Sequence, residues 1–563
     1  MTGANTRTGL AERVQAWIAE DPDPRCREEL RGLLAAGDRA ELERRFAATL
    51  EFGTAGLRGR LEAGPARVNR ATVRQATAAL AAHLRGAAAA AERARVVVGH
   101  DARHGSAALA QEAGRVLTGA GLHALDLPGQ VPTPLLAFAV RRLGCAAGVM
   151  ITASHNPPQD NGYKVYLGDG AQLAPPIDAE IAARIRAVGP LTEVPLGPAP
   201  QPVDDAIIAD YVDAIVAALP RARSAAHAAP LRTVYTPLHG VGRDVLLRAL
   251  AHAGFDPPQL VAAQAEPDPD FPTVPRPNPE EPGTLDLGLA EAERLDADLL
   301  LANDPDADRL AVAIPDRDGW RMLSGDEVGA LLARHLLAHC DDPGAALLIT
   351  TVASSSLLGQ MAKAAGVAYR ETLTGFKWIM RAVADAAPRR LLFAYEEALG
   401  YAVSDVVRDK DGISAALAMC QLAMEARASG TTPAAQLDEL ARRFGLHATR
   451  QVAVALESDE GPGRARRTMQ RLRARPPARI AGRAVTEVED LLRGERLPPA
   501  DVLVVRCGDG LRVVVRPSGT EPRLKAYLEV IVPVAGEDMA RARERADRQL
   551  EESARAMREL LGE

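Results

Sequence analysis

Apolar runs of strand length recur along most of the chain, and each is followed by a polar loop. Val96–Gly99, Cys145–Ile151, Leu299–Ala302 and Leu347–Thr351 are such runs. The stretches between them carry apolar residues at the three-to-four-residue spacing of amphipathic helices. Continuous apolar strands that alternate with helices are typical of doubly wound α/β sheets, in which helices cover both faces.

Both ends of the chain depart from this pattern. From Leu10 to Leu50 the apolar spacing predicts amphipathic helices, interrupted at Asp21–Pro24 and at Gly37-Asp38. Beyond Phe444 an arginine-rich helix is followed by two apolar runs on either side of Gly508–Gly510, which indicates a β-hairpin. We therefore expect a helical preface before the first sheet and a smaller, more antiparallel domain at the end.

The chain has 563 residues, which is too many for one hydrophobic core. The stretch 189–202 is rich in proline and lacks periodicity, so we interpret it as a connector. We predict four domains, at residues 1–205, 206–321, 322–444 and 445–563.

Composition excludes few functions, but the sequence indicates where in the cell we expect the protein. Hydrophobic residues make up 47% and charged residues 25%, as in ordinary globular proteins, and the net charge of -7 gives no reason to expect nucleic acid. We find no signal-peptide pattern and no apolar run of membrane-spanning length, so we expect a cytoplasmic protein without a membrane partner. The five scattered cysteines lack CxxC spacing and indicate neither a disulfide framework nor a zinc site.

Thr152–Pro158 is the stretch around which we organise the function. It follows the apolar run Cys145–Ile151 and carries Ser154 and His155, so a serine lies at the carboxyl end of a predicted strand. Ligands usually bind at this edge of an α/β sheet, and an activated serine there can carry a phosphate. The alternative is an ordinary polar turn, because Ser, His, Asn and Pro are common loop residues.

Asp304, Asp306 and Asp308 occupy alternate positions after another predicted buried strand. Three carboxylates this close repel one another unless a cation lies among them, and oxygen ligands favour Mg2+. The spacing is similar to the start of an EF-hand loop, but the glycine and distal glutamate of that motif are missing. A solvated acidic turn is the alternative.

Four other stretches carry candidate chemistry. Glu51–Arg60 combines glycines with Arg58, Lys164 lies on a predicted strand, and Arg516–Lys525 combines hydroxyls, a glycine and cations in the manner of a phosphate site. Glu396 and Glu397 directly follow an apolar strand, where carboxylates can accept hydrogen bonds from sugar hydroxyls. A helix N-terminus explains the two glutamates nearly as well, and solvated turns or a solvated lysine remain alternatives for the other three stretches.

Taken together, the stretches described above resemble loops of the α-D-phosphohexomutase superfamily, the phosphoglucomutases and phosphomannomutases, and they occur in the same order along the chain. The resemblance covers essentially the whole chain. The helical preface running into Glu51–Gly59 is most similar to the branch with phosphopentomutase and glucose 1,6-bisphosphate synthase activities. The loops that resemble the family's phosphoserine, metal, sugar and distal phosphate loops are Thr152–Pro158, Asp304–Arg309, Tyr395–Gly400 and Arg516–Arg523.

The resemblance implies a fold and a reaction. The fold would be α/β with four domains around a central cleft: three topologically similar mixed α/β sheet domains plus a smaller C-terminal α+β domain. The reaction would interconvert the 1- and 6-phosphates of glucose, mannose or both, through a phosphoserine and a bisphosphorylated sugar. The cofactors would be one Mg2+ per chain and glucose 1,6-bisphosphate as activator or intermediate.

The same resemblance implies roles for individual residues. The catalytic residues would be Ser154, His155, Lys164 and Arg58. Mg2+ would bind Asp304, Asp306 and Asp308 together with the phosphate on Ser154. The substrate-binding residues would be Arg309, Thr374, Gly375, Glu396, Lys410, Arg516, Ser518, Gly519, Thr520 and Arg523.

Other functions remain open on the sequence. Hexose-specific members commonly have a serine after the two glutamates, whereas this chain has Ala398, so pentose phosphates are alternative substrates. Glucose 1,6-bisphosphate synthesis and phosphate hydrolysis are further enzyme alternatives, and a non-catalytic sugar-phosphate sensor is an alternative of another class. The expected partner is a small phospho-sugar, and we expect a monomer or a weak homodimer.

Overall fold

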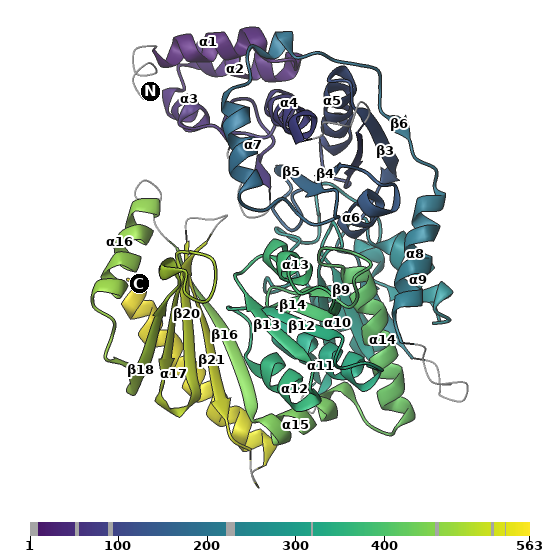
Figure 1. The fold of residues 1–563 in the computed structure, drawn as a ribbon, viewed down its shortest axis with the longest axis vertical. Coiled ribbons are helices and arrows are strands. Elements are labelled where there is room, and N and C mark those ends of the chain that lie inside the picture. Colours follow the sequence, from purple (N-terminus) through teal and green to yellow (C-terminus); the bar gives the residue numbers. More distant parts are fainter. Residues whose placement is uncertain are drawn as a thin grey trace.

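The computed structural model describes residues 9–50, 56–87, 94–220, 231–316, 319–455, 461–518, 523–534, 536 and 538–562. Its strands form four sheets that follow one another along the chain. Figure 1 shows the first sheet and its helices at the top, the second and third in the middle, and the last sheet beside them at the left. The predicted arrangement of three mixed sheets and one antiparallel sheet is confirmed.

The first three sheets share one strand order. In each, the first strand lies between the second and the third and runs parallel to both, while the fourth returns antiparallel beside the third. The twelve strands are β2 (Arg95–His100), β3 (His123–Gln130), β4 (Ala147–Ile151) and β5 (Asp160–Leu167); β7 (Thr233–Thr236), β8 (Gln259–Leu260), β9 (Leu299–Asn303) and β10 (Leu310–Asp316); and β12 (Ala346–Thr351), β13 (Ala368–Thr372), β14 (Arg390–Glu396) and β15 (Gly400–Ala402).

The reversal from the third to the fourth strand therefore occurs at the same place in all three sheets. It falls at residues 152–159, 304–309 and 397–399. These are the serine, aspartate and glutamate loops, so one topological position supplies all three.

Burial explains the apolar runs. Every residue of β4, β9 and β12 is buried, because helices cover both faces of each sheet. The covering helices are α4 (Arg70–Ala87), α5 (Ser106–Gly119), α6 (Thr133–Arg142) and α7 (Ile177–Arg186); α8 (Ala206–Ala218), α9 (Arg243–His252) and α10 (Asp286–Arg294); and α11 (Gly325–Ala338), α12 (Leu357–Ala365), α13 (Phe376–Ala384), α14 (Gly412–Ala428) and α15 (Pro433–Phe444).

The helical preface is present as α1 (Leu10–Glu20), α2 (Pro24–Ala36) and α3 (Arg39–Phe46). The predicted interruptions hold the caps of the next helix, because the Asp23 carboxylate accepts a hydrogen bond from the Arg25 amide and the Asp38 carboxylate from the Glu41 amide. The proline-rich stretch 189–202, predicted to be a connector, also supplies the edge strand β6 (Gln201–Pro202), which pairs with β3.

The remaining strands complete the sheets. β1 (Leu57–Arg60) joins the first sheet beside β5, and β11 (Gly319–Met322) joins the second beside β10. The last sheet is antiparallel throughout, α16 (Gly461–Ala474) and α17 (Met539–Leu561) pack against it, and the predicted hairpin is β19 and β20. Its strands are β16 (Leu446–Ala455), β17 (Arg479–Ile480), β18 (Arg483–Asp490), β19 (Leu503–Cys507), β20 (Leu511–Pro517) and β21 (Arg523–Val532).

Across the described part of the chain, we find no helix with both the length and the apolar character needed to cross a membrane.

Candidate active site

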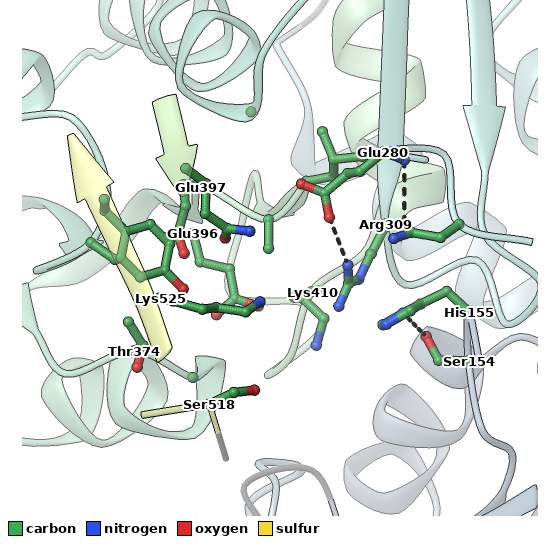
Figure 2. A pocket seen from close by; sticks show the side chains of 18 of the residues that line it. Ser154, His155, Glu280, Arg309, Thr374, Glu396, Glu397, Lys410, Ser518 and Lys525 are labelled. Atoms are coloured by element: carbon green, nitrogen blue, oxygen red, sulfur yellow. Dashed lines mark hydrogen bonds and ion pairs between the residues drawn. The ribbon is translucent and has the colours of Figure 1, made fainter. Parts of the chain in front are cut away.

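The four sheets enclose a cleft of about 850 Å³. Figure 2 shows Ser154, His155 and Arg309 on one side of it and Thr374 and Lys525 on the other. The predicted site residues that line it are Arg58, Ser154, His155, Lys164, Asp308, Arg309, Thr374, Gly375, Glu396, Lys410, Arg516, Ser518 and Arg523. Asp304 and Asp306 lie buried behind its wall, and Gly519 and Thr520 lie outside the described residues.

Ser154 lies in the reversal after β4, in a strained conformation with a φ of 55°. Its hydroxyl donates a hydrogen bond to Oδ2 of Asp304 at 2.6 Å and lies 3.2 Å from Nδ1 of His155. The serine is only 1% exposed. The serine loop of the first sheet thus meets the aspartate loop of the second.

Arg103, in the loop after β2, holds the backbone of the serine loop. One guanidinium nitrogen donates to the carbonyl oxygens of Ser154 and Asn156 at 2.5 and 2.6 Å, and the other donates to those of Pro157 and Asp160 at 2.8 and 3.2 Å. This planar fork of donors fixes the direction of the loop, and with it the position of the Ser154 hydroxyl.

The three aspartates are almost completely enclosed, with exposures of 0%, 0% and 2% for Asp304, Asp306 and Asp308. Burial, added to the negative charges of Asp306 and Asp308, raises the pKa of Asp304 well above its usual value. Burial acts in the same direction on Asp308, but Lys164, Lys410 and Arg309 outweigh it and lower the pKa of that carboxyl.

Two lysines and a backbone amide, from three different sheet regions, contact these carboxylates. Nζ of Lys164, on β5, lies 2.7 Å from Oδ2 of Asp306 and 3.2 Å from Oδ2 of Asp308. Nζ of Lys410 lies 3.3 Å from the same oxygen of Asp308. The backbone amide of Arg309 donates to Oδ1 of Asp304 at 3.1 Å.

Two carboxylate oxygens have no hydrogen-bond partner among the described residues. Oδ1 of Asp306 and Oδ1 of Asp308 are buried and accept no hydrogen bond. The three aspartates offer ligand atoms that lie within 4.8 Å of one another. A hard divalent cation with oxygen ligands fits this group, whereas an isolated acidic turn would be solvated.

His155 and Arg58 complete this side of the cleft. Burial, reinforced by the charges of Arg309 and Arg58, lowers the pKa of His155 well below its usual value, so the imidazole is neutral. Arg58, on β1, lies 3.4 Å from the side-chain oxygen of Asn156 in the serine loop.

The two glutamates do not begin a helix, so that alternative interpretation is wrong. Glu396 ends β14, and the chain turns into β15. Oε2 of Glu397 accepts hydrogen bonds from Thr351 and Ser354 at 3.0 and 3.1 Å. Burial is the main cause that raises the pKa of Glu396 to about 7; Lys410 opposes this shift and Glu397 adds to it. Glu396 is thus the less restrained of the two.

Thr374 and Gly375 precede α13 at the cleft wall. Gly375 has a φ of 107°, which L side chains rarely adopt, and it is the N-cap of the helix. The helix N-terminus therefore presents backbone amides next to the cleft, which is a favourable place for an anion.

The last sheet adds further cations. A terminal nitrogen of Arg516, at the end of β20, donates to the Tyr527 hydroxyl at 3.0 Å, and Arg523 and Lys525 follow on β21. Together with Ser518 they line the cleft. Positive charge at this end is suited to a phosphate.

Sequence reasoning missed several residues of the site. Arg103, Glu280, Lys525 and Tyr527 contact the predicted residues or line the cleft. Lys525 lies within the predicted phosphate stretch and could have been selected on charge. Arg103 and Glu280 carry no local pattern, because their partners are 51 and 29 positions away.

Four family models match the chain, for domains I, II and III and the C-terminal domain of phosphoglucomutase/phosphomannomutase. They match residues 49–190, 209–319, 324–444 and 467–546. The matches include the serine, aspartate and glutamate loops.

Individual relatives agree with these matches. The chain is 40% identical to a protein of Haemophilus influenzae named "Probable phosphomannomutase", with 82% of this chain and 93% of the relative covered. It is 32% identical to the phosphopentomutase of Mus musculus, with 95% and 93% covered. A crystal structure of a phosphoglucomutase/phosphomannomutase family protein of Burkholderia thailandensis shares the fold, with a TM-score of 0.67, 22% identity, and 90% and 97% of the two chains covered.

We predict that Arg103→Lys lowers kcat by about 10- to 100-fold with little change in KM. Lysine keeps the charge but cannot donate to four carbonyl oxygens, so the Ser154 hydroxyl moves away from Asp304. Steady-state kinetics test this, with Arg115→Lys, on the exposed side of α5, as the matched control. An unchanged kcat in Arg103→Lys would show that the fork does not position the serine.

Proposed function

Because the chain belongs to the phosphoglucomutase/phosphomannomutase family, we propose that it interconverts the 1- and 6-phosphates of glucose, mannose or both through a phosphoserine at Ser154. The enzyme is a sugar phosphate mutase. The observation that carries the proposal is the contact of the Ser154 hydroxyl with Asp304, at the edge of an aspartate group in which two buried oxygens accept no hydrogen bond from the described residues. A serine in this position can exchange phosphate beside a bound cation.

Mg2+ is the cation that the aspartates fit, and when bound it neutralises the charge on the phosphate that is transferred. Asp304, Asp306 and Asp308 would hold it, with an oxygen of the Ser154 phosphate as a further ligand. Arg58 and Arg309 add positive charge at the same side of the cleft. Phosphoryl transfer depends mainly on such positioning and charge.

Lys164 is the group that we assign to proton transfer. When a sugar hydroxyl attacks phosphorus, the bond from phosphorus to Oγ of Ser154 breaks; the Lys164 ammonium gives a proton to the departing Oγ, and the resulting amine takes the proton of the attacking hydroxyl. In the reverse step the Lys164 ammonium protonates the departing sugar oxygen, and the amine takes the Ser154 hydroxyl proton as the phosphate goes back to Oγ. His155 is neutral and lies beside Oγ, so we assign it to orienting the serine.

The far side of the cleft would bind the phosphate that is not transferred. Arg516, Ser518 and Arg523 line it, and Thr374, Gly375, Glu396 and Lys410 lie between the two sides. A sugar bisphosphate, such as glucose 1,6-bisphosphate, could then exchange its two phosphates between the sides. Gly519 and Thr520 remain candidates in the same loop. We propose that the protein is a monomer or a weak homodimer.

A pentose phosphate is the second candidate substrate. Ala398 lines the cleft in the glutamate loop and offers no hydroxyl to a sugar. The mouse phosphopentomutase matches 95% of this chain. We regard glucose 1,6-bisphosphate synthesis and phosphate hydrolysis as further outcomes of the same phosphoserine, which release of bisphosphate or free phosphate would reveal.

We predict that Ser154→Ala abolishes mutase turnover and leaves the protein folded, because the change removes the phosphate carrier and only two side-chain hydrogen bonds. Activity on glucose 1-phosphate is measured with and without glucose 1,6-bisphosphate, and intact mass should show one phosphate on the wild type only. If Ser154→Ala retained a tenth of the wild-type rate, the proposal would be contradicted. If the wild type itself gave no turnover, the proposal would also be contradicted, and the sensor alternative would be favoured.

We predict that kcat/KM falls as the pH drops below about 7. Glu396 binds sugar hydroxyls as a carboxylate, and its raised pKa, about 7, means that it takes up a proton in this range. Glu396→Gln should lower kcat/KM by about tenfold or more at high pH and remove this dependence. The substrate phosphate also ionises near pH 6, but it does so equally with both proteins. If the fall of kcat/KM at low pH is the same in Glu396→Gln as in the wild type, the phosphate causes it and Glu396 does not.

We predict that Ala398→Ser raises the ratio of hexose to pentose activity several-fold, because one added hydrogen bond contributes about 1 kcal/mol. The measurement is kcat/KM for glucose 1-phosphate, ribose 1-phosphate and deoxyribose 1-phosphate. Ala353→Ser, which adds a hydroxyl elsewhere in the cleft wall, is the control. If the wild type discriminates against pentoses a thousandfold, or the ratio does not move, Ala398 does not set the preference.

A further inference from the structure

Two histidines and a glutamate form a cluster at the end of α11 that lies away from the cleft. His335 is in the last turn of α11, His339 is its C-cap, and Glu425 is on α14. The N-terminal residues Gly325 and Asp326 of α11 line the cleft. The cluster therefore lies roughly 15 Å further along the helix. None of these three residues lines the cleft or takes part in the proposed reaction.

The spacing within the cluster is that of ligands around a small metal ion. Nδ1 of His335 lies 3.3 Å from Oε2 of Glu425, and Nε2 of His339 lies 3.2 Å from Oε1 of the same carboxylate. The ligand atoms of all three residues lie within 4.8 Å of one another. Zinc bonds to nitrogen and oxygen place neighbouring tetrahedral ligands about 3.4 Å apart, which is close to these separations.

The cluster also contains buried polar atoms without a well-formed hydrogen bond. They are Nε2 of His335, Oε1 of Glu425 and Oε1 of Gln421, one turn before Glu425. The His335 side chain is only 2% exposed. Buried polar atoms are rarely left in this state, because each loses its hydration. Of the three, Oε1 of Glu425 is the atom that a cation bound between the two histidines would satisfy.

The surroundings orient both rings in the manner of metal-ligating histidines. Nδ1 of His339 lies 2.9 Å from the backbone oxygen of His335, so it donates there and leaves Nε2 with its lone pair directed at Glu425. Nε2 of Gln421 donates to the carbonyl oxygen of Pro220 at 3.1 Å, so its Oε1 is available to accept a hydrogen bond from Nε2 of His335.

Solvent can reach part of the cluster. The side chains of His339 and Glu425 are 15% and 27% exposed, so an ion and a water molecule can reach the cluster.

We propose that His335, His339 and Glu425 form a second metal site, which binds Zn2+ or a similar divalent transition-metal ion. Nδ1 of His335, Nε2 of His339 and the Glu425 carboxylate are the ligands, and water completes the coordination. Imidazole ligands favour such ions over Mg2+, so the two sites select different metals. The ion ties α11 to α14 and stabilises the third sheet region.

Zinc binding to the full chain tests this proposal. Metal-free protein is titrated with Zn2+ in the presence of excess Mg2+, which competes for the aspartate group. The variants are His339→Asn and Glu425→Gln. They change side chains that are partly exposed and leave the buried ring of His335 in place. We expect each to weaken zinc binding at one site per chain by about 100-fold. Co2+ should give visible d–d absorption in the wild type that both variants lose.

Thermal unfolding provides a second readout. Zn2+ should raise the Tm of the wild type and should not raise that of the variants, because binding stabilises only the folded state. His252→Asn, which removes an exposed histidine 3.4 Å from Asp213, is the matched control and should bind zinc like the wild type. Mutase activity with Mg2+ should be unchanged in His339→Asn.

The proposal is overturned if the wild type binds no Zn2+ in excess Mg2+. It is also overturned if His339→Asn and Glu425→Gln bind Zn2+ with wild-type stoichiometry and affinity, which would place the ion at the aspartates or on the surface. In either case the cluster is a histidine–glutamate ion pair, and the proposed mutase function is unaffected.

Discussion

The enclosed negative charge of Asp304, Asp306 and Asp308 is the constraint on which the site depends. Three carboxylates with no more than 2% exposure cannot remain ionised without compensating charge. The compensation comes from other parts of the chain, because Lys164 belongs to the first sheet and Lys410 to the third. These ion pairs hold the three sheets together around one point, and the two aspartate oxygens that accept no hydrogen bond from the described residues leave a place for a divalent cation.

The repeated topology explains why the necessary groups meet. Each of the first three sheets reverses direction after its third strand, and that reversal carries the serine, the aspartates or the glutamates. An open α/β sheet offers its ligands at the carboxyl ends of its strands. Turning three such edges toward a common space places Ser154, the aspartates and the two glutamates, the proposed phosphate carrier, cation ligands and sugar acceptors, around one cleft, while the antiparallel fourth sheet adds Arg516 and Lys525.

The sequence predicted what is local and missed what depends on packing. Ser154 and the aspartates follow buried apolar strands, so pattern and chemistry coincide within a few residues. Glu396 and Glu397 were ambiguous, because a strand that continues past a tight turn and a helix that starts there look alike in sequence. Arg103 gains its role only when the chain folds back onto the serine loop. The cysteine spacing argued against zinc, yet His335 meets Glu425 across 90 positions of sequence, which no local pattern reveals.

Lys410 links recognition of the sugar to the charge of the metal site. Its ammonium lies 3.3 Å from Asp308, and its charge opposes the burial that raises the pKa of Glu396. A divalent cation bound at the aspartates would weaken the attraction of Asp308 for this lysine and leave more of its charge available to Glu396. The carboxylate form of Glu396 would then be favoured. Glu397, held by two hydroxyls, does not share this coupling as directly. In the proposed reaction, the cation that assists phosphate transfer would therefore also favour the form of Glu396 that accepts hydrogen bonds from sugar hydroxyls.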